Sequence, residues 1–287
     1  MEAPNWGWTS LPIMGLFLLS IISLITFIGW EKKIPHPLVE LTLFKNLTFT
    51  TLFSVLLIIQ AVAIVFVFLA IFLQNVLHYS PLMAGLLLLP AMVPIMLMAP
   101  VGGHLRDKYG PTLPMFCGAL LVVLSLIWIA IFSHNRGYAW LFPGLLVYGI
   151  GMPLILSGIM ATVMNMVNAQ QRGMASAIFN CARQFGNTIG LALLTGLLAS
   201  VNKWQLNSFL HHSPVPLSRL KEQQIDGLLV QSDQAMKAIA HLSLAHIELL
   251  KTAALNAYTN AFSMTLLAAA ILAFLSLFLI LKIPRKQ

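Results

Sequence analysis

Long apolar runs alternate with short polar segments along most of the chain. A helix needs about 20 apolar residues to cross the hydrocarbon core of a bilayer. Seven runs meet that requirement and predict transmembrane helices at Leu11–Trp30, Phe49–Gln74, Leu82–Gly103, Leu113–Ser133, Trp140–Met164, Met174–Ser200 and Asn260–Lys282. The sixth run is the most polar of them. In the third run, kinks are predicted at Pro90, Pro94 and Pro100.

Composition supports this interpretation and excludes other classes of protein. Of the 287 residues, 59% are hydrophobic and 8% are charged, and the mean hydropathy is +0.89. A soluble domain carries roughly 25% charged residues, so a water-soluble fold is excluded. Disorder is excluded as well, because disordered chains have few apolar residues and many charges. The formal net charge of +8 does not indicate nucleic-acid binding, because the basic residues are spread over loops and chain ends. The sequence therefore predicts an all-α integral membrane protein.

The distribution of basic residues predicts the orientation in the membrane, because cytoplasmic loops carry an excess of Lys and Arg. The segments after the first, third and fifth runs, together with the chain end, hold Lys32, Lys33, Lys45, Arg106, Lys108, Arg172, Lys282, Arg285 and Lys286. Five of the six basic residues in the opposite segments lie in one long loop, where charges count less. We therefore expect a multi-pass protein with its N-terminus outside and its C-terminus in the cytoplasm.

The same pattern divides the chain into five segments. An N-terminal helix (1–30) is followed by a Pro-containing cytoplasmic linker (31–48), five helices (49–200), an extracytoplasmic loop (201–259), and the last helix with a basic tail (260–287). Within the loop, apolar residues recur at roughly helical spacing from Leu217 to Leu250. This spacing predicts an amphipathic helix or helix pair at the outer surface.

The most specific local pattern is Gly102-Gly103-His104-Leu105-Arg106-Asp107-Lys108-Tyr109-Gly110, between the third and fourth runs. Glycines such as Gly103 and Gly110 permit close helix packing and a sharp reversal. Asp107 is suited to accept hydrogen bonds from a neighbouring helix N-terminus, and Arg106 and Lys108 are suited to cytoplasmic headgroups. The alternative is a basic turn that only fixes topology.

The sixth run combines a charge inside the predicted span with small residues. Arg183 lies roughly 13 Å into the run at helical rise, where a charge is costly and should face protein or water. It either makes a gating or helix-coupling contact or extends toward the cytoplasmic headgroups. Ala182, Gly186 and Gly190 recur at intervals of four, a spacing that lets two helices approach closely.

Polar side chains inside the runs are the candidates for a substrate pathway, the alternative being that they face lipid or other helices. They are Gln60, Asn180, Arg183, Gln184 and Asn187. The eight acidic residues all lie in loops or at span ends, so no run holds an evident proton carrier. Neither a nucleophile–base arrangement nor a phosphate loop is present, and Cys117 and Cys181 lie in apolar runs. We therefore expect no enzyme activity, no cofactor and no metal site.

Several of these segments resemble one family of transporters. The segment Gly102–Gly110 resembles the signature loop of the major facilitator superfamily in its C-terminal copy. The stretch Phe72–Gly85, and Arg172–Ser176 followed by Arg183–Gly190, look like the fourteen-span drug:proton antiporters of the EmrB/QacA type. The resemblance begins near Trp6 and maps onto the last linker helix plus the C-terminal six-helix bundle. A complete member has a further N-terminal half, which holds the antiporter motif and usually the proton-coupling carboxylates.

The resemblance implies a function and partners. It implies the C-terminal part of a multidrug efflux permease of the bacterial inner membrane, which exports hydrophobic or cationic compounds by proton-coupled alternating access. As partners it implies the lipid bilayer, small-molecule drugs, a separately encoded N-terminal half or self-association, and a periplasmic adaptor protein at the outer loop. The missing half and the absent carboxylate favour an alternative, an inactive membrane remnant of a truncated or split transporter gene. A seven-span receptor or channel is a third hypothesis, which the resemblance disfavours.

Overall fold

The computed structural model of the protein describes residues 10–31, 33, 41–212 and 244–283. In this part of the chain seven helical spans are long and apolar enough to cross a membrane, which confirms the seven predicted runs and the all-α class. Three short 3-10 helices, η1 (Leu41–Lys45), η2 (Ser133–Asn135) and η3 (Ala169–Gln171), lie between spans. The spans are α2 (Leu11–Glu31), α3 (Leu47–Ala63) with α4 (Val65–Asn75), α5 (Pro81–Leu87) with α6 (Leu89–Tyr109), α7 (Thr112–Phe132), α8 (Tyr138–Met166), α9 (Arg172–His212) and α12 (Leu244–Leu281).

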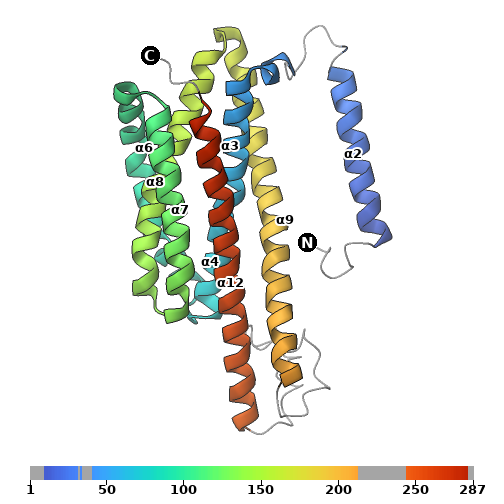
Figure 1. The fold of residues 1–287 in the computed structure, drawn as a ribbon, viewed down its shortest axis with the longest axis vertical. Coiled ribbons are helices and arrows are strands. Elements are labelled where there is room, and N and C mark those ends of the chain that lie inside the picture. Colours follow the sequence, from blue (N-terminus) through green and yellow to red (C-terminus); the bar gives the residue numbers. More distant parts are fainter. Residues whose placement is uncertain (1–9, 32, 34–40, 213–243, 284–287) are drawn as a thin grey trace.

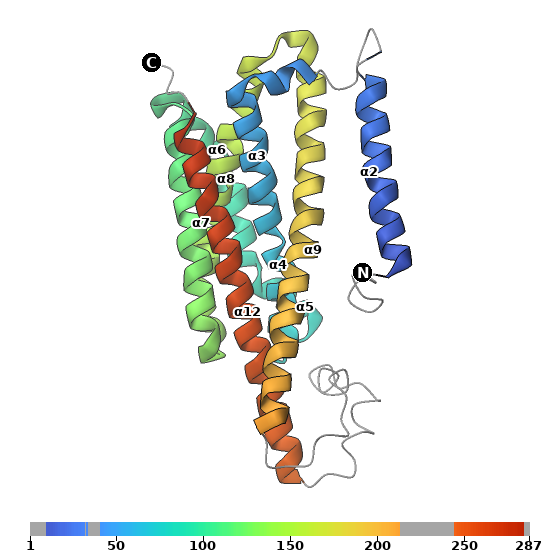
Figure 2. The ribbon, with the colours of Figure 1, turned by 45° about the vertical axis from the view of Figure 1, so that its right-hand side comes forward.

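Six of the spans pack into one bundle (Figure 1). Helix α7 packs along α8 and α12, and α12 also contacts α3 and α9, so α3, α7, α8 and α12 contain most of the core. A ring contact also joins α4 to α12, the stacked pair Phe72–Phe262 at 4.5 Å between centroids. Helices α6 and α9 lie at the rim, where α6 packs mainly on α8 and α9 mainly on α3. Helix α2 stands apart from the bundle in both views (Figures 1 and 2).

Two spans are broken within their length, at Ile64 and at Leu88. Helix α5 ends before Leu88, and α6 begins at Leu89 with Pro90 in its first turn. This break agrees with the predicted kink at Pro90, because a proline ring disfavours helix at the preceding residue. The second break separates α3 from α4 at Ile64. No proline or glycine lies beside it, so nothing in the local sequence predicted it.

The ends of three helices differ from the predicted ones. Helix α6 continues to Tyr109, so the predicted turn at Gly102–Gly110 is helical except for its last residue. At the opposite end, α9 continues to His212 and α12 begins at Leu244, so both extend into the predicted 201–259 loop. Hydropathy marks only the part of a helix inside lipid, whereas a helix continues into water where packing supports it. The rest of the predicted amphipathic segment lies outside the described residues.

Polar contacts support the extensions of α9 and α12 beyond the core. In the turn between α7 and α8, the His134 ring bonds Asn260 of α12 at 2.8 Å, and Asn260 donates to Gln205 of α9 at 3.1 Å. Arg136, in the same turn, donates to Asn256 of α12. The network joins the turn between α7 and α8 to α12 and α9, and it fixes the spacing of α9 and α12 beyond the core.

Helix α3 begins with a side-chain cap whose removal should weaken the fold. The Asn46 Oδ1 atom accepts hydrogen bonds from the backbone N–H groups of Thr48 (2.9 Å) and Phe49 (3.4 Å). Asn46→Ala should lower the free energy of unfolding by about 1 kcal/mol, the usual value of such a cap, whereas Asn46→Ser should retain most of it. Denaturant unfolding of the purified chain in detergent measures both, and equal losses for the two variants would contradict this role.

Candidate functional site

One candidate site lies where α6, α8 and the start of α3 meet. Arg106 Nε donates to Asp107 Oδ1 at 2.9 Å, and the two side chains form an ion pair. Asp107 remains 66% exposed, so the pair borders open space. One cavity of about 560 Å³ lies between this pair and Asn165 of α8, and a second, of about 510 Å³, extends to Asn46 at the start of α3. The pair therefore borders cavities that the ends of α8 and α3 also line.

The structure revises the roles of the residues around this pair. The closely packed glycine is Gly102, because a methyl group there would lie 2.5 Å from Ser157 Oγ of α8, whereas Gly103 has open space around it. Gly110 takes φ of 79°, a conformation that favours glycine and reverses the chain after α6. Within the described residues Asp107 bonds Arg106 rather than a helix N-terminus. Lys108 lies 5.2 Å from the centre of the Tyr109 ring.

Helix α9 presents small residues to α3. Ala182, Gly186 and Gly190 are all buried on this side. A methyl group on Gly186 would lie 2.5 Å from the carbonyl oxygen of Leu57, and one on Gly190 would overlap the carbonyl oxygen of Ala61. The two helices therefore cross with their backbones in contact, as intervals of four small residues permit.

The polar side chains of α9 lie on a different arc of the same helix. Asn180, Arg183 and Gln184 are exposed, and Asn187 is half-buried. We call these four residues the polar arc. In the described part of the chain Arg183 has no ion-pair partner. Gln60 does not belong to this group, because it is buried on α3 beside Gly186, at the α3–α9 crossing.

The outer face of α7 shows what a lipid-facing surface looks like in this chain. Its exposed large side chains are apolar and include Leu120, Leu124 and Ile131. Placing a guanidinium or an amide in the same environment would cost on the order of several kcal/mol for each group, because hydrocarbon offers no hydrogen-bond partner. The polar arc of α9 therefore requires water or another protein surface. It is the most unusual exposed surface within the described spans.

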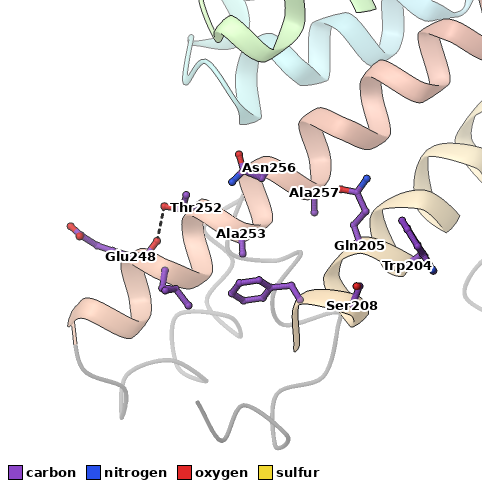
Figure 3. Close-up of a pocket in the computed structure, with 10 residues that line it drawn as sticks. Trp204, Gln205, Ser208, Glu248, Thr252, Ala253, Asn256 and Ala257 are labelled. Atoms are coloured by element: carbon purple, nitrogen blue, oxygen red, sulfur yellow. Dashed lines mark hydrogen bonds between the residues drawn. The ribbon is translucent and has the colours of Figure 1, made fainter. Parts of the chain in front are cut away.

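A groove of about 830 Å³ separates the outer extensions of α9 and α12 (Figure 3). Trp204 and Gln205 line it from α9, and Glu248 and Asn256 line it from α12. It lies about 30 Å along α9 from Arg183 at helical rise, so it is separate from the polar arc. The sequence could not reveal this groove, because both of its walls fall in the segment that hydropathy assigns to a loop.

Comparison with known proteins identifies the family. The family model described as Major Facilitator Superfamily matches residues 3–191. The chain belongs to the major facilitator superfamily. With its seven apolar spans, the chain is therefore a multi-pass membrane protein of a transporter family.

Curated relatives align with part of their own length. A protein of Mycobacterium tuberculosis named "Multidrug resistance protein Stp" is 31% identical over 221 residues, which are 76% of this chain and 41% of that protein. The "Tetracenomycin C resistance and export protein" of Streptomyces glaucescens is 27% identical over 202 residues, 70% of this chain and 37% of that protein. The "Multidrug transporter protein MdtP" of Bacillus subtilis is 24% identical and is covered to 54%. The chain thus spans about half or less of the length of these relatives.

A solved transporter shares the fold. The bacterial homolog of the human lysosomal transporter Spinster, in an inward-facing and occupied conformation, superposes with a TM-score of 0.59. The two are 16% identical in sequence, and the match covers 83% of this chain and 49% of that one. The likeness shows that this superfamily chain has the arrangement of about half of a transporter of that fold.

Proposed function

We propose that this chain is the C-terminal part of a multidrug efflux permease of the fourteen-span EmrB/QacA type, which exports hydrophobic or cationic compounds by proton-coupled alternating access. The observation that carries the proposal is the polar arc of α9, with Arg183 on an exposed surface. Such a surface fits the wall of a water-filled pathway and does not fit lipid. The names of the relatives, which refer to multidrug resistance and export, supply the substrate class.

The rim helices are the surfaces that we assign to an N-terminal half. Helix α6 buries only Ala91 and Gly102 within the bundle, and α9 keeps its polar arc uncovered. We infer that a second six-helix unit, in the same or a separate polypeptide, covers both helices and completes the pathway along Asn180, Arg183, Gln184 and Asn187. Self-association is the alternative source of that unit. Gln60 would then support the pathway wall through the α3–α9 crossing.

Proton coupling is assigned to the partner half. The described acidic residues are Glu31, Asp107 and Glu248, and each lies at or beyond the end of a span. A proton relay needs an ionisable group within the membrane, so we infer that the N-terminal half supplies the carboxylate. A periplasmic adaptor is a further partner, which we propose on the family resemblance alone.

The orientation proposed from the basic residues is consistent with the fold. Arg106 lines one cavity with Asn46, Asp107 and Ile283, and Lys45 and Lys282 adjoin two of these residues in the chain. Helix α9, which begins at Arg172, starts at the same end of the bundle (Figure 1). We propose that this end faces the cytoplasm of a bacterial inner membrane. The N-terminus of α2 lies at the opposite end in the same view. Residues Gly103, Arg106, Asp107, Lys108 and Gly110 would then form a cytoplasmic segment that couples the movements of α6 to those of α8 and α3.

An efflux assay tests this proposal through Asp107. The chain is expressed in bacteria that lack their own drug pumps, alone and with the N-terminal half of a curated relative, and ethidium efflux is followed by fluorescence. We expect protonophore-sensitive efflux from the pair of halves. Asp107→Asn should slow efflux roughly tenfold at equal membrane abundance. The variant loses one charge-assisted hydrogen bond of about 1.5 kcal/mol, and a barrier raised by that amount slows transport about tenfold.

The matched control is Glu248→Gln, which removes the same charge at the other end of the bundle and should leave efflux unchanged. Unchanged efflux in Asp107→Asn would make the Arg106–Asp107 pair structural only. Absence of efflux from the wild-type chain, both alone and with the N-terminal half, would favour the inactive remnant.

A further inference from the structure

A tyrosine hydroxyl is buried without a partner inside the bundle. Tyr148 lies in α8, and its side chain is only 2% exposed. Its hydroxyl forms no hydrogen bond with any described residue. Leaving a buried hydroxyl unsatisfied lowers stability, whereas phenylalanine would fill the same space without that cost. The hydroxyl oxygen of Tyr148 therefore does not stabilise this packing, so its presence needs a reason other than stability.

Tyr148 packs beside an aromatic ring of α4 and next to the backbone of α6. The Phe66 ring meets the Tyr148 ring edge to face, with 4.8 Å between centroids and 70° between planes. The next residue, Gly149, packs against the backbone of Ala91 in α6. A methyl group added at Gly149 would lie 3.1 Å from the Ala91 Cα atom. An ordered water needs two or more polar partners; the Phe66 ring provides none, and the Ala91 carbonyl oxygen lies against Gly149.

The two rings differ in their freedom to move. Tyr148 is fixed by the backbone contact between α8 and α6 at Gly149. Phe66 is half-buried and is the second residue of α4, directly after the break in the span at Ile64. Broken helices near the middle of the membrane commonly line transporter sites. A movement of α4 about this break would displace Phe66 and leave Tyr148 in place.

We propose that Tyr148 is a specificity-determining residue that donates a hydrogen bond from its hydroxyl to substrates carrying a carbonyl or ester oxygen. Phe66 packs against the Tyr148 ring in the present structure, and in this proposal the hydroxyl becomes accessible when α4 moves. The inference rests on the proposed function, and it adds the chemical class of substrate. Hydrophobic cations that carry an acceptor oxygen gain this bond, whereas cations without an acceptor use only the aromatic and apolar surfaces.

Two probes of different chemistry test the inference. Rhodamine 6G carries an ester carbonyl, and tetraphenylphosphonium has no hydrogen-bond acceptor. Their binding is measured on the chain assembled with the same N-terminal half in lipid nanodiscs, by fluorescence polarisation for the dye and by competition for the phosphonium. Tyr148→Phe should weaken rhodamine 6G binding about five- to tenfold, the loss of one hydrogen bond, and should leave tetraphenylphosphonium binding within about twofold. The melting temperature should stay equal or rise, because an unsatisfied group is removed.

The chain offers a matched control. Tyr258 in α12 also has a buried hydroxyl without a hydrogen-bond partner among the described residues, but it lies two residues from Asn256 and Asn260, in the outer polar network. Tyr258→Phe should leave the binding of both probes unchanged. An equal weakening of both probes by Tyr148→Phe, or no weakening of either, would overturn the inference. If wild-type halves bind neither probe, the proposed function itself fails, which is a different result from a loss of discrimination.

Discussion

Gly190→Ala is expected to separate α3 from α9 and to cause a large loss of stability from a single methyl group. That methyl group would overlap the carbonyl oxygen of Ala61 and would lie 2.5 Å from its Cα atom. Both are backbone atoms, so no rotamer change relieves the clash, and the helices must move apart along their whole crossing. Such overpacking costs about 1–3 kcal/mol, and the rigid neighbour places the expected loss at the upper end. Thermal unfolding of the purified chain in nanodiscs measures it.

The appropriate control is Gly173→Ala, which adds the same methyl group to the first turn of the same helix. Nothing lies within 4 Å of that position, so the variant should be neutral or slightly stabilising, because alanine favours helix over glycine by about 1 kcal/mol. Gly186→Ala should fall between the two, since its contact with Leu57 is also with backbone but is less close. Equal melting temperatures for Gly190→Ala and Gly173→Ala would show that α3 and α9 do not cross at Gly190.

The spans were predictable because the thickness of the bilayer dictates their length and composition. The ends of the spans were less predictable. A helix that leaves the membrane loses its hydropathy signal while its backbone hydrogen bonds continue. This explains why α9 runs to His212 and α12 begins at Leu244. The same loss of signal explains why the charged segment before Gly110 was predicted to be a turn, although it forms the end of α6.

The candidate site was predictable to the same limited extent. Residues four apart share a helix face, so the sequence alone grouped Gly186 with Gly190 and indicated close packing. It could not tell that α3 is the helix on the other side, or that Gln60 lies at that crossing and away from the polar arc. The break at Ile64 and the unpartnered hydroxyl of Tyr148 arise from contacts between spans, and no residue type marks either of them in advance.

Thiol labelling of α9 should proceed at very different rates at two neighbouring positions. Gln184 and Phe185 are adjacent and both exposed, but they are about 100° apart around the helix, so only Gln184 belongs to the polar arc. In a background without Cys117 and Cys181, a hydrophilic methanethiosulfonate should modify the variant Gln184→Cys at least about tenfold faster than Phe185→Cys. The reason is that the reactive species is the thiolate, which forms in water and not in hydrocarbon.

The pair is informative because depth and helix are held constant and only the direction of the side chain changes. The measurement uses the chain assembled with an N-terminal half, because the pathway exists only when the polar arc is covered by a second unit. Rhodamine 6G should slow the labelling of Gln184→Cys if this arc contacts substrate, and it should not affect Phe185→Cys. Equal rates at the two positions, or faster labelling at Phe185→Cys, would mean that the polar arc does not line water. Arg183 would then have to reach the cytoplasmic headgroups along the helix, as a long cationic side chain can, and the assignment of the pathway to α9 would be wrong.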